Sequence, residues 1–180
     1  MKLYLLLAVI FFISGCSSKE SRYIFPSTPN NVVANTKVQI GVKEVVVPSY
    51  LNSDKILVKS GAKITQIDAK FADTPSKMLT QKEIEIFKKS LNNPYVFLYP
   101  WEVKRKSGYI VEIKLDDIIY EDKEVILAGS YYIKSSNGSI KLAKNFILKE
   151  MANKDAKSIV TSISTLFNNL VVEIAKKIAR

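Results

Sequence analysis

The stretch VILAGSYYIKSSNGSIKLAKNFILK, residues 125–149, decides the fold, because it contains two strand-like runs joined by a tight turn. Residues 125–134 and 139–149 are rich in β-branched, aromatic and other apolar residues, which favour strands. Asn137-Gly138 between them is typical of a hairpin turn, since both residues tolerate positive φ. Residues 109–120 have a similar composition, so the sequence predicts a three-stranded meander.

A long helix is expected after the meander, over residues 155–178. Apolar residues recur there at helical spacing and form one stripe: Ile159, Ile163, Leu166, Phe167, Leu170, Ile174 and Ile178. Polar residues such as Thr161 and Lys176 fall away from the stripe, which indicates a helix packed on a sheet.

Two further strands and a hairpin are expected on the N-terminal side of the meander. Residues 38–47 are rich in β-branched residues and end at Pro48, which cannot donate to a sheet ladder, so they predict a strand. The runs KILV and KITQID flank Ser60-Gly61 and predict a short hairpin or two extended pieces. Residues 95–99 predict another strand just before the meander.

The first helix has clear start and stop signals. Thr80-Gln81-Lys82-Glu83 fits a capping box, and Leu79 and Ile84 occupy the positions of a hydrophobic staple, so we expect the helix to begin there. Asn92-Asn93-Pro94 is expected to end it. The order of strand, crossover helix, strand, meander and helix describes an α/β (α+β) domain with a mixed sheet of about five strands.

The N-terminus resembles the signal sequence of a bacterial lipoprotein. Met1-Lys2 is a short positive region, and residues 3–13 form an apolar run of about 11 residues, which is shorter than the roughly 20 needed to span a bilayer. Small residues then precede Cys16, the single cysteine of the chain. We expect Cys16 to carry diacylglycerol and an N-acyl chain. The alternative is an unpaired cysteine in an ordinary signal peptide that is cut elsewhere.

The domain organisation follows from this signal. Residues 1–15 are interpreted as the lipoprotein signal peptide, residues 16–37 as a lipidated tether and edge segment, and residues 38–180 as a single domain. The chain has 27 Lys and Arg against 17 Asp and Glu, a net charge of +10. A basic exported protein suits anionic lipid head groups, or the charge only keeps the surface soluble; nucleic acid is not an expected partner.

The residues argue against catalysis. Histidine is absent, so Ser-His-Asp and Cys-His catalysis and the usual zinc ligand sets are not expected. Asp116-Asp117 would point to opposite faces of a strand, and Glu121-Asp122 is typical of a hairpin turn. No phosphate-binding glycine motif is present. We therefore expect no enzyme activity, no metal and no cofactor other than the covalent lipid.

An aromatic stretch, PYVFLYPW, stands out before the meander. Alternation places Tyr95, Phe97, Tyr99 and Trp101 on one face if the strand continues that far. This face is either an exposed platform for lipid or a partner, or is covered by a helix. Trp101 lies close to Lys104-Arg105-Lys106 and is the strongest candidate for an interfacial residue.

The segment VVVPSYL, residues 45–51, resembles the V-x-V-P-x-Y-L segment of the PqiC-like family of ABC-type transport auxiliary lipoproteins. The resemblance extends to YIFP at residues 23–26, similar to an early Tyr-x-Leu-Pro strand, and to the order of the later strands and the last helix. Phe71-Ala72 stands where the family has Trp-Ala, so this chain departs from the family pattern by lacking the indole.

The resemblance implies a non-enzymatic, lipid-anchored protein that faces the periplasm and supports intermembrane lipid transport. Its implied partners are an MCE-domain protein and ABC transporter components, with a homo-oligomer also compatible. Ser17 after the cysteine favours the outer membrane over the inner membrane. Pro48, Tyr50, Leu51 and Trp101 are the candidate contact residues for a partner or membrane. Two alternatives remain: a surface or structural lipoprotein that binds envelope or host polymers, and a carrier that holds lipid.

Overall fold

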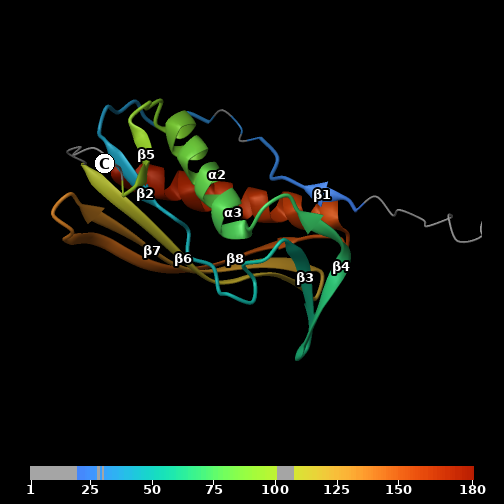
Figure 1. The fold of residues 1–180 in the computed structure, drawn as a ribbon. Coiled ribbons are helices and arrows are strands. Elements are labelled where there is room, and N and C mark those ends of the chain that lie inside the picture. The colour runs from blue at the N-terminus through green and yellow to red at the C-terminus, as the bar shows by residue number, and fades with distance from the viewer. Residues whose placement is uncertain (1–19, 28, 30, 101–107) are drawn as a thin grey trace, which may run out of the picture.

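The computed structural model describes residues 20–27, 29, 31–100 and 108–180. Cys16 and Trp101 therefore lie outside the described residues. The elements follow in this order: β1 (Arg22–Tyr23), β2 (Ile40–Lys43), β3 (Lys55–Ser60), β4 (Lys63–Phe71), α2 (Pro75–Ser90), β5 (Val96–Tyr99), β6 (Tyr109–Glu121), β7 (Glu124–Ser135), β8 (Ile140–Met151) and α3 (Ala156–Ile178). Both helices lie on one face of the sheet (Figure 1).

The eight described strands form one mixed sheet, which confirms the expected class although it has more than the expected five strands. β6 lies at its centre. One edge of β6 pairs with β7, which in turn pairs with β8, and both pairings are antiparallel. The other edge is shared, because β2 pairs in parallel with the start of β6 and β3 pairs in parallel with its end. β5 extends the sheet beyond β2, and β4 and β1 extend it beyond β3.

The turns of the meander are where the sequence predicts them. Gly138 has φ +86°, as the Asn137-Gly138 turn requires. Asp122 and Lys123 both have positive φ and join β6 to β7, so the expectation of a hairpin turn there is confirmed. The predicted hairpin around Ser60-Gly61 is also confirmed, since β3 and β4 pair in antiparallel fashion.

The predicted strand over residues 38–47 is shorter in the structure, where β2 ends at Lys43. The reason lies at Val45, whose backbone binds α2 instead of a strand. Its N–H donates to Thr80 Oγ1 at 2.9 Å, and its carbonyl accepts from Ser76 Oγ at 2.6 Å. Val46 then returns to the sheet, where it forms a single parallel bridge with Lys114.

The predicted start of the first helix is wrong. α2 begins at Pro75, with Thr74 as its N-cap, so Thr80 lies inside the helix. Proline at the first helical position costs no hydrogen bond and has a helical φ. The predicted end is confirmed, because the helix stops at Ser90 with Leu91 as C-cap. Backbone N–H groups of Val33, Ala34 and Thr36 satisfy the last carbonyls.

α3 confirms the predicted C-terminal helix and closes the core. The Asp155 side chain caps it by accepting from the Ser158 N–H at 2.9 Å, and the whole predicted apolar stripe is buried. By length and composition α3 could cross a membrane, yet 61% of its most apolar window is buried inside the domain. Its apolarity is therefore accounted for by packing on the sheet.

The sheet face opposite the helices is uncovered by any described helix (Figure 1). Alternation decides which side chains lie there. Lys144 faces α3, because its Nζ lies 2.7 Å from a carboxylate oxygen of Glu173. Its register partner is Tyr131, so the neighbouring Tyr132 points to the opposite face. We call this opposite side the outer face of the sheet.

Candidate functional site

The VPSYL segment forms a tight turn after β2. The Pro48 carbonyl accepts from the N–H groups of Leu51 and Asn52, at 2.9 and 3.0 Å. Tyr50 is 53% exposed, whereas Leu51 is only 3% exposed and belongs to the core. Leu51, a candidate contact residue by sequence, is therefore not at the surface, since the turn directs its side chain inward.

Tyr50 and the half-buried Pro48 remain at the surface. Partial burial, followed by the negative charge of Asp117, raises the pKa of Tyr50, while the nearby Lys59 opposes the shift. Tyr50 is thus a neutral phenol close to one acidic and one basic side chain. A partner would meet a polar aromatic surface here.

The β5 stretch is partly exposed. Val96 is fully buried, whereas Tyr95 is 42% and Leu98 46% exposed. Phe97 and Tyr99 are half-buried. β5 pairs with β2 alone among the described strands and so forms an edge of the sheet.

The acidic pairs lie at an irregular point of β6 and at its end. The register of β6 with β7 shifts between Leu115 and Asp117, which leaves Asp116 without a partner on β7. Burial raises the pKa of Asp117, and one of its carboxylate oxygens has no hydrogen-bond partner in the described part of the chain. Glu121 accepts from Lys59 at 3.0 Å. Within residues 20–27, 29, 31–100 and 108–180, no three His, Cys, Asp or Glu side chains are placed to hold a metal ion.

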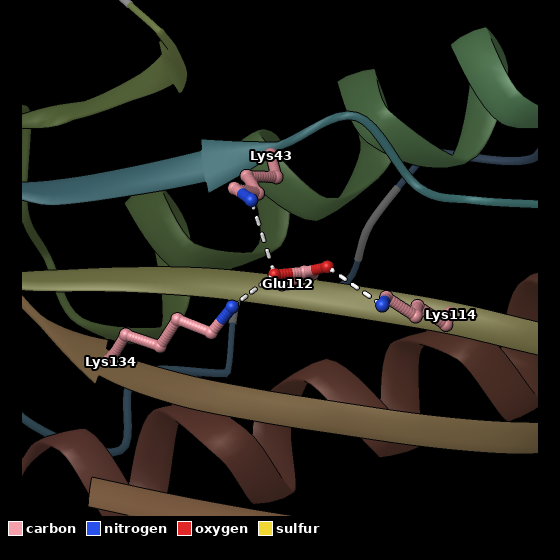
Figure 2. A network of polar contacts seen from close by, with 4 residues as sticks. All are labelled: Lys43, Glu112, Lys114 and Lys134. Atoms are coloured by element: carbon pink, nitrogen blue, oxygen red, sulfur yellow. Dashed lines mark hydrogen bonds and ion pairs between the residues drawn. The ribbon is translucent and has the colours of Figure 1, made fainter. Parts of the chain in front are cut away.

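A charged cluster that the sequence did not reveal lies on the outer face. Figure 2 shows Glu112 of β6 surrounded by lysines from three strands. Lys43 and Lys134 approach its Oε2 at 3.2 and 2.6 Å, and Lys114 approaches Oε1 at 3.2 Å. The Glu112 side chain is 9% exposed, whereas those of Lys43 and Lys114 are 38% and 47% exposed. We call these four residues the lysine cluster.

The lysines keep Glu112 ionised. Burial alone would raise the pKa of Glu112, but hydrogen bonds from Lys134, Lys114 and Lys43 outweigh it and lower the pKa from 4.5 to about 2. Tyr132 lies directly opposite Glu112 on β7 and so is next to the lysine cluster. The Nζ atoms of Lys114 and Lys134 each lie 5.5 Å from its ring centroid, which is within range of a cation–π contact.

Comparison with known proteins gives one matching family and several solved structures of similar fold. A family model described as the ABC-type transport auxiliary lipoprotein component matches residues 24–175. Among curated proteins, no relative matches. The solved structure of a protein described as uncharacterized has 16% identity and a TM-score of 0.71, covering 88% of this chain and 98% of that one.

Two further solved structures are similar in fold. A Xanthomonas campestris protein of the family DUF330 has 12% identity and a TM-score of 0.69, covering 89% of this chain and 92% of that one. The PelC dodecamer from Paraburkholderia phytofirmans has 8% identity and a TM-score of 0.50, covering 86% of this chain and 94% of that one. At these identities the likeness concerns the fold alone. Because the family model spans nearly the whole domain, the chain belongs to the family of ABC-type transport auxiliary lipoprotein components.

Proposed function

We propose that the chain is a lipid-anchored, non-enzymatic auxiliary protein of an MCE/ABC-type intermembrane lipid transport system, facing the periplasm. The observation that carries the proposal is the family match over residues 24–175. It follows a short way after the sequence that resembles a lipoprotein signal and ends at Cys16. The family is described as a transport component and as a lipoprotein, which supports both halves of the proposal.

The anchor and the domain are close together in the chain. Arg22 of β1 follows Cys16 by six residues, which span at most about 20 Å when fully extended. An acylated Cys16 would hold the domain next to the bilayer at the edge formed by β1 and β4. Such a protein contacts the other components of the system from the membrane surface.

Affinity purification from native membranes tests this function. The full-length protein should recover an MCE-domain protein and an ABC transporter component in mild detergent. Cys16→Ser should leave the membrane fraction or stay unprocessed, because one or more acyl chains supply the anchoring energy, about 0.8 kcal/mol per buried CH₂. Ser18→Ala, close to the anchor, is the matched control and should behave as the wild type.

Two results would contradict the proposal. One is the recovery of no MCE or ABC component by the wild type. The other is membrane retention of a processed Cys16→Ser variant, which would refute the lipid anchor. Protease treatment of intact cells adds the topology, since a protein facing the periplasm is protected and a surface lipoprotein is cut.

The proposal includes self-association. β8 pairs with β7 alone among the described strands, so its other edge has free backbone groups. On the outer face of this strand, Ile147 is 72% and Met151 68% exposed. Unpaired edges and exposed apolar side chains are typical of surfaces that meet another chain. Light scattering of the purified protein, with Ile147→Asp as the disrupting variant, measures the oligomeric state.

A second candidate function, holding lipid, has one observation in its favour. The segment Ile24–Pro26 and α2 line an open groove of about 480 Å³. Phe25 and Met78 are apolar walls, and Lys77 and Lys82 are cationic. Mass spectrometry of the purified non-acylated chain decides this function, since a co-purified lipid supports it and a lipid-free protein excludes it.

A further inference from the structure

The lysine cluster contains more positive charge than Glu112 requires. Three lysines face one carboxylate, which leaves a net charge of +2. Lys43 and Lys134 bind the same oxygen, so two like charges are close neighbours. The three lysines together offset the burial of the Glu112 carboxylate. They still leave two positive charges of the cluster that Glu112 does not neutralise.

The exposure of the cluster shows which charges another molecule would meet. Glu112 lies beneath the lysines at 9% side-chain exposure, while the side chain of Lys114 is 47% exposed. Each ammonium group has three donors, and the contacts to Glu112 use one of them on each lysine. The other donors are available to carboxylates or phosphates that approach the outer face.

Tyr132 gives this surface an aromatic centre. It is half-buried on β7, between Lys114 and Lys134, and each of their Nζ atoms lies 5.5 Å from its ring centroid. Tyrosine is enriched in protein–protein interfaces because it provides contact area at low entropic cost. A fixed aromatic ring between cations is suited to a protein segment that carries both carboxylates and apolar groups.

The position of the cluster favours a protein over the bilayer. β1 joins the sheet through β4 and β3, and β3 meets β6 only at Tyr120 and Glu121 within the described register. Glu112 precedes Tyr120 by eight residues, which is roughly 26 Å along the strand. The cluster therefore lies at the opposite end of β6 from the anchored edge.

We propose that Lys43, Lys114 and Lys134 around Glu112, with Tyr132, form a docking surface for an acidic segment of a partner protein. This inference rests on the proposed function, in which the anchored domain contacts other transport components. The charge complementarity and the exposed donors identify the chemistry of the partner segment: several carboxylates close together, beside an apolar or aromatic residue.

Binding of a defined acidic probe tests the surface directly. The acylated full-length protein in detergent is titrated with a labelled peptide of eight glutamates and one leucine at about 50 mM salt. We expect the Lys43→Gln, Lys114→Gln double variant to bind at least about tenfold more weakly. Glu112→Gln should bind more tightly, because it removes the central negative charge while leaving the lysines.

A matched control separates the cluster from the overall charge. Lys59 and Lys149 each pair with one carboxylate, Glu121 and Glu124 respectively. The Lys59→Gln, Lys149→Gln double variant loses the same +2 and should bind within about twofold of the wild type. Equal weakening in both double variants overturns the proposal, because the whole protein's field would then be responsible. Failure of the wild type to bind the peptide saturably also overturns it.

Vesicles and native membranes distinguish the remaining outcomes. If the Lys43, Lys114 double variant loses binding to vesicles of 30% phosphatidylglycerol but keeps the peptide, the surface belongs to the bilayer and the proposal is wrong. In purification from membranes, this double variant should lose partners that the wild type recovers. If it recovers them equally, only the docking surface is refuted; if the wild type recovers none, the proposed function itself fails.

Discussion

Glu83 is an acidic residue in an apolar, fully buried position. It lies fully buried on α2, on the same helix face as Leu79, Ile86 and Phe87. Neither carboxylate oxygen has a hydrogen-bond partner among the residues that the structure describes. Burial raises the pKa of Glu83 well above its ordinary value, so the carboxyl is harder to ionise in the folded state than in the unfolded chain.

Replacing Glu83 with an apolar side chain of similar length should stabilise the protein. We expect Glu83→Met to raise the free energy of unfolding at pH 7 by about 1–3 kcal/mol, because an unsatisfied buried polar group costs that much. Denaturant unfolding measures the change. Glu83→Gln is the control, since it cannot ionise but keeps a buried polar group. A loss of stability in Glu83→Met would mean that the carboxyl makes a favourable contact in the folded protein.

At the scale of elements, two hydroxyl groups of α2 bind the segment that follows β2. Thr80 Oγ1 accepts from the Val45 N–H and donates to the Ser76 carbonyl at 2.7 Å. Ser76 Oγ in turn binds the Val45 carbonyl. These bonds satisfy the buried backbone N–H and carbonyl of Val45, just after the chain leaves β2.

Thr80→Val tests this connection. The substitution keeps the shape of the side chain but leaves the buried Val45 N–H without its acceptor, so we expect a loss of about 1–3 kcal/mol in stability. Thr80→Ser keeps the hydroxyl and should cost less. Circular dichroism should show unchanged helix content in the valine variant. A loss of helix would instead support Thr80 as the helix cap.

The same residues explain what the sequence could and could not predict about the elements. The meander, its turns and α3 are determined by local patterns, and all were predictable. Thr80 and Glu83 fit a capping box by local pattern, yet the helix begins at Pro75. The Thr80 hydroxyl instead binds the backbone of Val45, 35 residues away, and such a contact cannot be predicted without the tertiary structure.

The lysine cluster also could not be predicted without the tertiary structure. Lys43, Glu112 and Lys134 are far apart in the chain and meet only through strand register. The alternation within each strand could have placed each residue on the outer face, but not beside the others. Of the predicted contact residues, Tyr50 is exposed and Leu51 is buried, because the orientation of side chains in a turn does not follow strand alternation.

For the whole molecule, the opposite pKa shifts of two glutamates predict that the free energy of unfolding is greatest in mildly acidic solution. The pKa of Glu112 is lowered from 4.5 to about 2, so its contribution is present above pH 4.5 and is lost as the pH falls towards 2. The pKa of Glu83 is raised, so its contribution is present below pH 4.5 and is lost as the pH rises through the folded-state pKa. The two contributions overlap near pH 4.5.

Unfolding measured from pH 2.5 to 8 on the Cys16→Ser chain checks this profile. Glu83→Gln should reduce the decline on the alkaline side, and Glu112→Gln should reduce the decline on the acidic side. A profile unchanged by either substitution would show that other groups govern the pH dependence.

The shared edge of β6 would have a mechanical consequence for a chain held by its N-terminus, as we propose. A pull on the proposed anchor would enter the sheet through β1, β4 and β3. Along the sheet, that force reaches β6 across the two residue pairs Val58–Tyr120 and Lys59–Glu121, whereas β6 and β7 are joined over their whole length. The β1–β4 junction is equally short, with the pairs Arg22–Lys70 and Tyr23–Phe71. The fold would therefore yield at one of these two junctions before the β6–β7 hairpin opens, and α3, which contacts β1, β4 and β6, reinforces the sheet across both.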